Sequence, residues 1–220
     1  RGGPSAGEGK QVPSLNAVLQ GTHQGGPKER GHRQVQTDDC IPAIRRRIMS
    51  IKENSPLSEA QKSEYFRRSY TAVDGLWFMK VEEALGFDQA LKLDEAVWRV
   101  LPKIQARTLK GMLNLKDGLA DLKRALTVRL TLEGFSFEMQ ERQEGFAVIV
   151  KSCPWHDIMV KSGRESLSDR VSDLICLVEN STWASEFDSD AEKGTQSSIK
   201  FDREQRICRN EGRCVLCFGR

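Results

Sequence analysis

The spacing of the apolar residues changes in the middle of this chain, and that change constrains the fold strongly. Before residue 134 the apolar side chains recur every three or four residues, which is the period of one face of an α-helix. From Phe135 onwards they alternate with polar side chains, which is the period of a half-buried β-strand. The alternation stops at Glu144-Gly145 and resumes at Phe146, so we predict a β-hairpin.

Capping residues mark where the helices before this hairpin begin and end. Ser58 followed by Gln61 fits a capping box, so we predict that a helix begins at Ser58. A second helical run over Leu76–Leu85 would end at Gly86, because glycine readily adopts the left-handed conformation that closes a helix. Pro102 lacks the backbone N–H that a helix interior needs, so we expect a kink or a break there.

The other predicted elements complete an α+β pattern. Asp117 is placed to cap a helix that ends at Gly134. After the hairpin the sequence predicts a short helix over 154–163, a longer helix over 168–187, and final strands over 199–208 and 214–218. Helices first, and then two hairpins with two helices between them, indicate an α+β fold with an antiparallel sheet.

Residues 1–48 differ in composition from the rest of the chain. They hold eight of the 18 glycines, no aromatic residue, and eight Lys or Arg against four Asp or Glu. Such a segment buries too little apolar surface to offset its ordering entropy, so we expect a disordered basic tail. Residues 49–220 are expected to form a single α+β domain, and Met49 looks like a natural start of translation.

Charge and hydropathy exclude several classes of partner for the folded part. Residues 49–220 hold 26 Lys or Arg against 27 Asp or Glu, so no nucleic-acid partner is expected. No stretch of eighteen apolar residues exists that would span a membrane, and no secretory signal is visible. We therefore expect a cytoplasmic protein whose six cysteines are reduced thiols.

The segment Cys153-Pro154-Trp155-His156 is the most informative one for chemistry. It stands where the second strand of the hairpin gives way to a helix. A thiol at a helix N-terminus feels the positive end of the helix dipole, which lowers its pKa and favours the thiolate. His156 stands three residues after Cys153, and zinc accepts both ligand types.

Two further cysteines are expected to join Cys153 in one site. Cys176 follows one helix later, and Cys214 lies on the core-facing side of the last strand, whereas Cys217 points away from the core. We predict that Cys153, Cys176 and Cys214, with His156 as a fourth ligand, hold zinc or iron. Two alternatives stay open: the cysteines simply pack as small apolar residues, or one of them is a catalytic thiol.

A second group of candidates lies in the helical half. Trp77 and Phe78 are aromatic residues that could line a ligand pocket, with Trp98 as a further candidate. Glu82 and Glu83 are the adjacent carboxylates that could transfer a proton. The alternative is that these aromatic residues pack in the core and that the glutamates are solvated.

Together these residues resemble a group of small uncharacterised bacterial and archaeal cytosolic proteins. The similarity lies in the run Tyr70-Thr71-Ala72-Val73-Asp74-Gly75-Leu76-Trp77-Phe78, then in Val81-Glu82-Glu83, Gly86-Phe87, Ala90-Leu91, Asp94, Val97-Trp98 and Ala106-Arg107, and later in Cys153-Pro154-Trp155, Gly163-Arg164-Glu165, Cys176, Trp183-Ala184 and Cys214. More distantly, the chain is similar to the L-2-amino-thiazoline-4-carboxylic acid hydrolases and to the vinyl-four-reductase domains, which sense small ligands and can carry a cysteine-bound zinc. The resemblance implies an α+β ligand-binding domain and favours a metal.

Three functions are compatible with these observations. The first is a small-molecule-binding domain with a cysteine-rich metal site. The second is a hydrolase that opens a cyclic C–N bond, in which a metal-bound water or the Cys153 thiolate attacks and Glu82 or Glu83 transfers the proton. The third is an interaction module whose cysteines pack and are inert.

Overall fold

The computed structural model describes residues 56–188 and 198–220 of the chain. The expectations for residues 1–48, a disordered tail and a start at Met49, lie outside this part. Within it, no helix combines the length and the apolar character that crossing a lipid bilayer requires.

Four helices precede the sheet: α3 (Glu59–Leu85), α4 (Phe87–Trp98), α5 (Leu101–Leu113) and α6 (Leu119–Glu133). The predicted capping box is confirmed, because the Ser58 hydroxyl accepts from the Gln61 N–H and the Gln61 side chain accepts from the Ser58 N–H. The predicted boundary before Leu76 is wrong, since α3 runs unbroken through Gly75. A single glycine costs a helix only about 1 kcal/mol, which a 27-residue helix tolerates.

The predicted breaks and caps are confirmed in part. Pro102 stands in the first turn of α5, directly after the break that follows Trp98, and Gly134 ends α6 in the left-handed conformation. Asp117 does not cap α6, because Gly118 occupies the N-cap position and the Asp117 carboxylate accepts instead from Lys110 Nζ at 2.6 Å.

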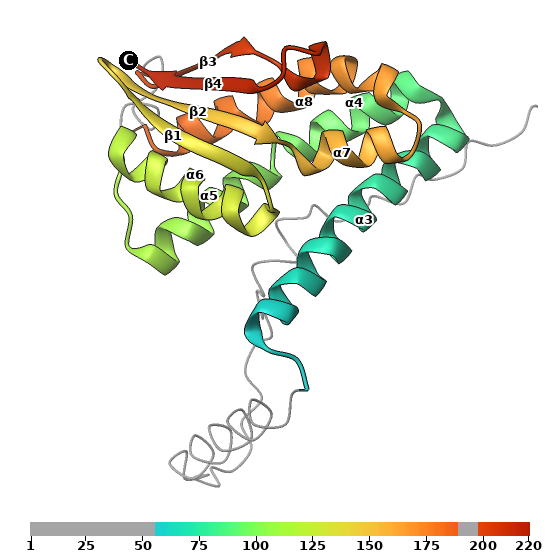
Figure 1. Cartoon of the computed structure of the whole chain (residues 1–220), viewed down its shortest axis with the longest axis horizontal. Coiled ribbons are helices and arrows are strands. Elements are labelled where there is room, and N and C mark those ends of the chain that lie inside the picture. Colours follow the sequence, from blue (N-terminus) through green and yellow to red (C-terminus); the bar gives the residue numbers. More distant parts are fainter. Residues whose placement is uncertain (1–55, 189–197) are drawn as a thin grey trace, which may run out of the picture. The chain divides into compact units, whose positions relative to one another are not determined.

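The sheet has four strands: β1 (Ser136–Arg142), β2 (Gly145–Ser152), β3 (Lys200–Gln205) and β4 (Cys214–Gly219). Their order is β1-β2-β4-β3, and all neighbours are antiparallel. Helices α7 (Pro154–Lys161) and α8 (Glu165–Glu186) connect the two hairpins, and the 3-10 turn η2 (Ile207–Arg209) joins β3 to β4. The predicted α+β class is thereby confirmed (Figure 1).

Two apolar clusters form the core. The larger one lies between α6, α8 and one face of the sheet, and its members include Leu122, Leu126, Phe146, Val148, Trp183 and Phe218. The smaller one joins α4 to α8 through Leu91, Trp98 and Ile175, with Trp155 of α7 packed against it. The region where these clusters meet holds the cavity described next.

Candidate functional site

A cavity of about 130 Å³ lies between the helices and the sheet. Its walls come from α3, α4, α6, α7, α8, η2, β2 and β4, so it gathers segments from the whole described part of the chain. Its polar and sulfur-bearing lining residues are Asp74, Asp94, Trp98, Arg129, Cys153, His156, Met159, Ser168, Ser172, Cys176, Glu179, Asn180, Cys208 and Cys214. Sulfur atoms and carboxyl groups thus share one small space.

The sequence-predicted thiols all line this cavity. Cys153 is the N-cap residue of α7, Cys176 lies on α8, and Cys214 is the first residue of β4. All three are free cysteines, and the charge that Cys153 or Cys214 would carry raises the pKa of Cys176. Cys208 of η2 joins them, and its Sγ lies 2.9 Å from the Ser172 hydroxyl.

The Cys153 thiol is held in its protonated form, opposite to the expectation from its place at a helix N-terminus. Burial raises its pKa to about 12. The backbone amides of His156 and Trp155 lower the pKa and oppose the rise, but they do not outweigh the loss of solvent. Burial likewise raises the pKa of Cys176 well above its ordinary value.

His156 of α7 lines the cavity, and its ring forms a hydrogen bond with another side chain. Nδ1 of His156 lies 2.7 Å from the buried hydroxyl of Ser168 on α8. Across residues 56–188 and 198–220, no group of three or more His, Cys, Asp or Glu side chains is arranged to hold a metal ion. In this conformation the thiols and His156 therefore surround one space without forming a coordination sphere, and the metal site stays a prediction.

Two aspartates also line the cavity. Burial raises the pKa of Asp74 on α3 to about 6. Burial also raises the pKa of Asp94 on α4 to about 7, with a further contribution from the charge of Asp74. The Trp98 indole donates a hydrogen bond to Asp94 and partly opposes this rise. Both carboxyls therefore change protonation close to neutral pH.

A buried ion cluster contributes Arg129 and Glu179 to the cavity lining. The Arg129 guanidinium of α6 donates to Glu133 at 3.0 Å and to Glu179 of α8. Burial lowers the pKa of Arg129, but the two carboxylates outweigh it, so this side chain stays cationic. Burial raises the pKa of Glu179, against the opposing effect of Arg129. The guanidinium also lies 5.5 Å from the Trp183 ring centre.

The aromatic residues predicted to bind a ligand separate into two groups. Trp98 lines the cavity and packs edge-on against Trp155, with 5.8 Å between ring centres. Trp77 is 68% exposed, and Phe78 packs against Phe87 at 5.8 Å, so neither of the two lines the cavity.

The two glutamates predicted to transfer protons also lie outside the lining. Glu82 accepts from Arg164 at 2.5 Å, and Glu83 pairs with Lys80 at 2.7 Å on the exposed face of α3. The carboxyls that do line the cavity, Asp74, Asp94 and Glu179, were not predicted as site residues. The spacing of Asp94 and Trp98, one helical turn apart, was the one signal for this group.

Comparison with known proteins gives a family without an assigned activity. The profile of a family described as "Family of unknown function (DUF6125)" matches residues 60–205, which run from the first turn of α3 to the end of β3. No curated protein and no solved structure matches the chain. The more distant resemblance to thiazoline-carboxylate hydrolases and vinyl-four-reductase domains stays a prediction.

Proposed function

The chain belongs to the family of unknown function DUF6125, and from its cavity we propose that it is a small-molecule-binding domain. The observation that carries the proposal is the cavity itself, which lies where the two apolar clusters meet. Concave, largely apolar sites with a few convergent polar groups are the usual form of ligand sites. Groups with raised pKa values in such a space add support.

The dimensions and lining restrict the ligand. A cavity of about 150 Å³ accommodates benzene, so a space of about 130 Å³ takes a ligand of about that size or smaller. The protonated thiols and Ile175 offer apolar contacts, while Asp74 and Asp94 offer hydrogen-bond acceptors. A compact molecule with an apolar body and at least one hydrogen-bond donor fits both kinds of lining residue.

A cavity-filling variant tests this proposal. Val171 lines the cavity from α8, whereas Val160 of α7 is 44% exposed and does not line it. We would screen the full chain by ligand-observed NMR against neutral, anionic and amine-bearing compounds no larger than benzene, and repeat each hit with Val171→Phe and Val160→Phe. We expect the Val171→Phe change to abolish binding and the Val160→Phe change to preserve it.

Two results would reject the site. One is the absence of any hit from the parent protein, and the other is a hit that binds Val171→Phe and the parent equally. Thermal melting of both variants shows whether each one is folded before it is compared. A hit lost equally in both variants places binding outside the cavity.

A hydrolase of cyclic C–N bonds is the second candidate, and the surroundings of Cys153 support it. The backbone amides of His156 and Trp155 favour its thiolate, and the nearby Glu179 carboxylate offers a proton acceptor. In such a reaction the sulfur would bond to the thiazoline ring carbon that lies between sulfur and nitrogen, the bond from that carbon to the ring nitrogen would break as the nitrogen takes up the thiol proton, and water would then displace the Cys153 thiol from the carbon. Cys153→Ser should abolish turnover of a thiazoline-carboxylate while leaving thermal stability unchanged, and retained turnover would remove Cys153 from the mechanism.

A bound zinc or iron ion is tested separately. Metal analysis of protein purified under reducing conditions should show one equivalent of metal if Cys153, Cys176 and Cys214 close around an ion. Loss of that metal in a Cys176→Ala variant would assign it to the cavity. Metal-free protein whose melting temperature is unaffected by a chelator would reject this prediction and leave small-molecule binding standing.

A further inference from the structure

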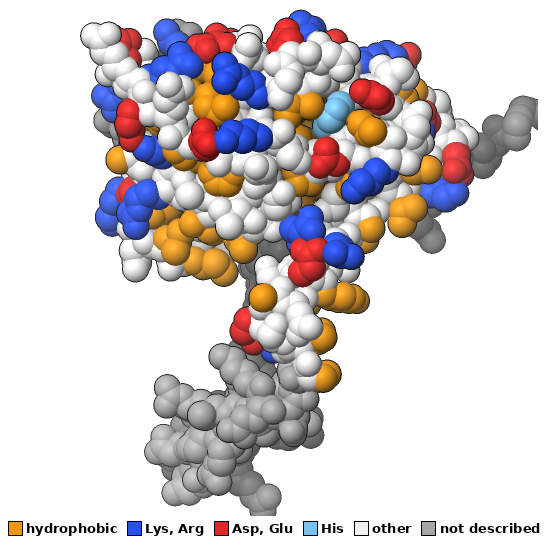
Figure 2. Space-filling view, viewed as in Figure 1, with side chains coloured by type: hydrophobic (Ala, Val, Ile, Leu, Met, Phe, Trp, Pro, Cys, Tyr) orange, Lys and Arg blue, Asp and Glu red, His pale blue; other side chains and the backbone are white. Residues whose placement is uncertain are grey.

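An uncovered apolar face runs along α3. Its members are Tyr65, Phe66, Val73, Leu76 and Trp77, which we call the α3 stripe, and each of these side chains is 57 to 68% exposed. Figure 2 shows hydrophobic side chains on the part of α3 that extends below the sheet in that view. Thr71, on another face of the same helix, is buried. The stripe is therefore separate from the face that α3 turns towards the cavity.

The five side chains of the α3 stripe lie on one side of the helix, with Ser69 between Phe66 and Val73. At 100° per residue its five side chains fall within a sector of about 120°, and from Tyr65 to Trp77 they extend about 18 Å along the axis. A sector of this width is what a helix presents to a partner across a packed interface.

The area of the stripe is close to what a dimer interface requires. Aromatic side chains carry about 150–250 Å² each, so the exposed parts of Tyr65, Phe66 and Trp77 alone amount to about 300–500 Å². Val73 and Leu76 add to this area. Two such faces together reach about 1,000 Å², which is the lower limit for a specific interface.

Four of the five residues in the stripe are placed symmetrically along the helix. Counted from Thr71, Tyr65 lies as far before it as Trp77 lies after it, and Phe66 is matched in the same way by Leu76. Beyond the ends of the stripe, Lys62 is matched by Lys80 and Glu59 by Glu83, and each lysine pairs with the nearby glutamate of its own helix. An antiparallel two-fold interface pairs positions placed in this way, whereas a different partner protein has no need of the symmetry.

We propose that a second copy of this chain covers the α3 stripe, with the two α3 helices antiparallel and the two-fold axis level with Thr71 but on the opposite side of the helix. Tyr65 of each copy then packs on Leu76 of the other copy, and Phe66 packs on Trp77. At each end of the interface Lys62 of one copy lies level with Lys80 of the other, and Glu59 and Glu83 flank these two lysines, so that two cations and two anions gather there.

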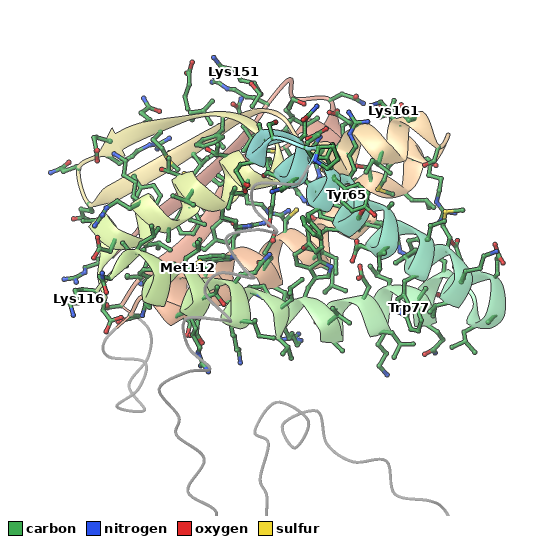
Figure 3. The ribbon with its side chains drawn as sticks, turned by 90° about the horizontal axis from the view of Figure 1, so that it is seen from below. Tyr65, Trp77, Met112, Lys116, Lys151 and Lys161 are labelled. Carbon is green, nitrogen blue, oxygen red and sulfur yellow. The ribbon has the colours of Figure 1, made fainter. Side chains whose placement is uncertain are left out.

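Sedimentation velocity of the full chain over a range of concentrations tests the partner. The parent protein should dimerise, and Trp77→Glu should weaken the dimer about 100-fold or more, because the charge enters a symmetric apolar interface twice. Met112→Glu is the matched control, since Met112 is 73% exposed on α5 and lies well apart from Trp77 in Figure 3. It should leave the dimer unchanged.

A charge-complementation variant tests the arrangement. Phe66→Lys alone should disrupt the dimer, and the double variant Phe66→Lys/Trp77→Glu should restore it at low salt. The two positions are about 16 Å apart within one helix, so only an antiparallel second copy brings them together. A monomeric parent protein, a dimer insensitive to Trp77→Glu, or a double variant no better than either single variant would each overturn the proposal.

Discussion

Replacing Asp94 with Asn should stabilise the protein at alkaline pH and have little effect at acidic pH. The Asp94 carboxyl is half-buried beside Asp74, and burial raises its pKa from 3.8 to about 7. Asn keeps an oxygen that accepts the hydrogen bond from the Trp98 indole, so the substitution removes the charge and little else.

The sign of the effect follows from where each state releases its proton. Below about pH 3.8 the carboxyl is protonated in the folded and unfolded states alike, and its pKa has no effect on stability. Between about pH 4 and 7 only the unfolded state ionises, which draws the equilibrium towards unfolding. Above a pH of about 7 the full penalty is present, so the raised pKa of Asp94 lowers stability as pH rises.

The size of the effect follows from the same two pKa values. A difference of one pKa unit between the two states corresponds to about 1.4 kcal/mol, so Asp94 would cost up to about 4 kcal/mol at pH 8. Part of the rise in the pKa of Asp94 comes from repulsion by the charge of Asp74, and replacing Asp94 with a neutral residue also removes this repulsion. We therefore expect Asp94→Asn to raise the free energy of unfolding by about 2–4 kcal/mol at pH 8.

Urea unfolding, followed by circular dichroism at several values between pH 4 and pH 8, measures this difference. Other carboxyls titrate over the same range, so the parent protein and the variant are compared at each pH. Asp202→Asn is the control, because Asp202 is exposed on β3. A stabilisation equal at pH 4 and pH 8, or none at pH 8, would refute the assignment of a buried, charge-penalised carboxyl.

Three further changes test the surroundings of the cavity. Because burial raises the pKa of Cys153 to about 12, its thiol should resist iodoacetamide at pH 8 in the folded protein and react in urea, as followed by mass spectrometry; rapid labelling of the folded protein would contradict this. Arg129→Met leaves buried carboxylates without their cation and should cost about 3–5 kcal/mol in urea unfolding, part of which Glu179→Gln should restore. Gly145→Ala places a Cβ too close to the Phe218 carbonyl oxygen. Hydrogen exchange of the backbone amides that pair β2 with β4 should therefore accelerate at least about tenfold. Unchanged exchange would show that the strands adjust to the added Cβ.

Local signals predicted the fold because they act within a few residues. The capping box at Ser58, the break at Pro102 and the alternation after Gly134 each depend on short-range geometry, and each appears in the structure. The boundary expected before Leu76 failed because a glycine inside a long helix is only a weak breaker. The cap expected at Asp117 failed because a nearby lysine competes for the same carboxylate.

The site could be predicted from the sequence only where the residue type itself suggests a chemical role. Cysteines are few in this chain, and Cys153 at an element end and Cys214 on the core-facing side of a strand were enough to predict that they share a site with Cys176. Arg129 and Glu179 are 50 residues apart and are two among many charged residues, so nothing local distinguishes their pairing from a solvated surface. The protonated state of Cys153 could not be predicted either, because burial depends on elements that pack from elsewhere in the chain.

The energetics of the cavity argue for a role beyond stability. Asp74 and Asp94 are ionisable groups in a half-buried space. Their raised pKa values mean that carrying a charge there costs folding free energy near neutral pH. Apolar residues of similar size would avoid that cost. Proteins lose such costly groups readily unless function retains them. Because the two carboxyls share the cavity with protonated thiols, a ligand that donates a hydrogen bond to either aspartate would recover part of the cost on binding. Such a ligand should therefore raise the melting temperature more at pH 8 than at pH 5, and a ligand effect independent of pH would show that it binds away from these carboxyls.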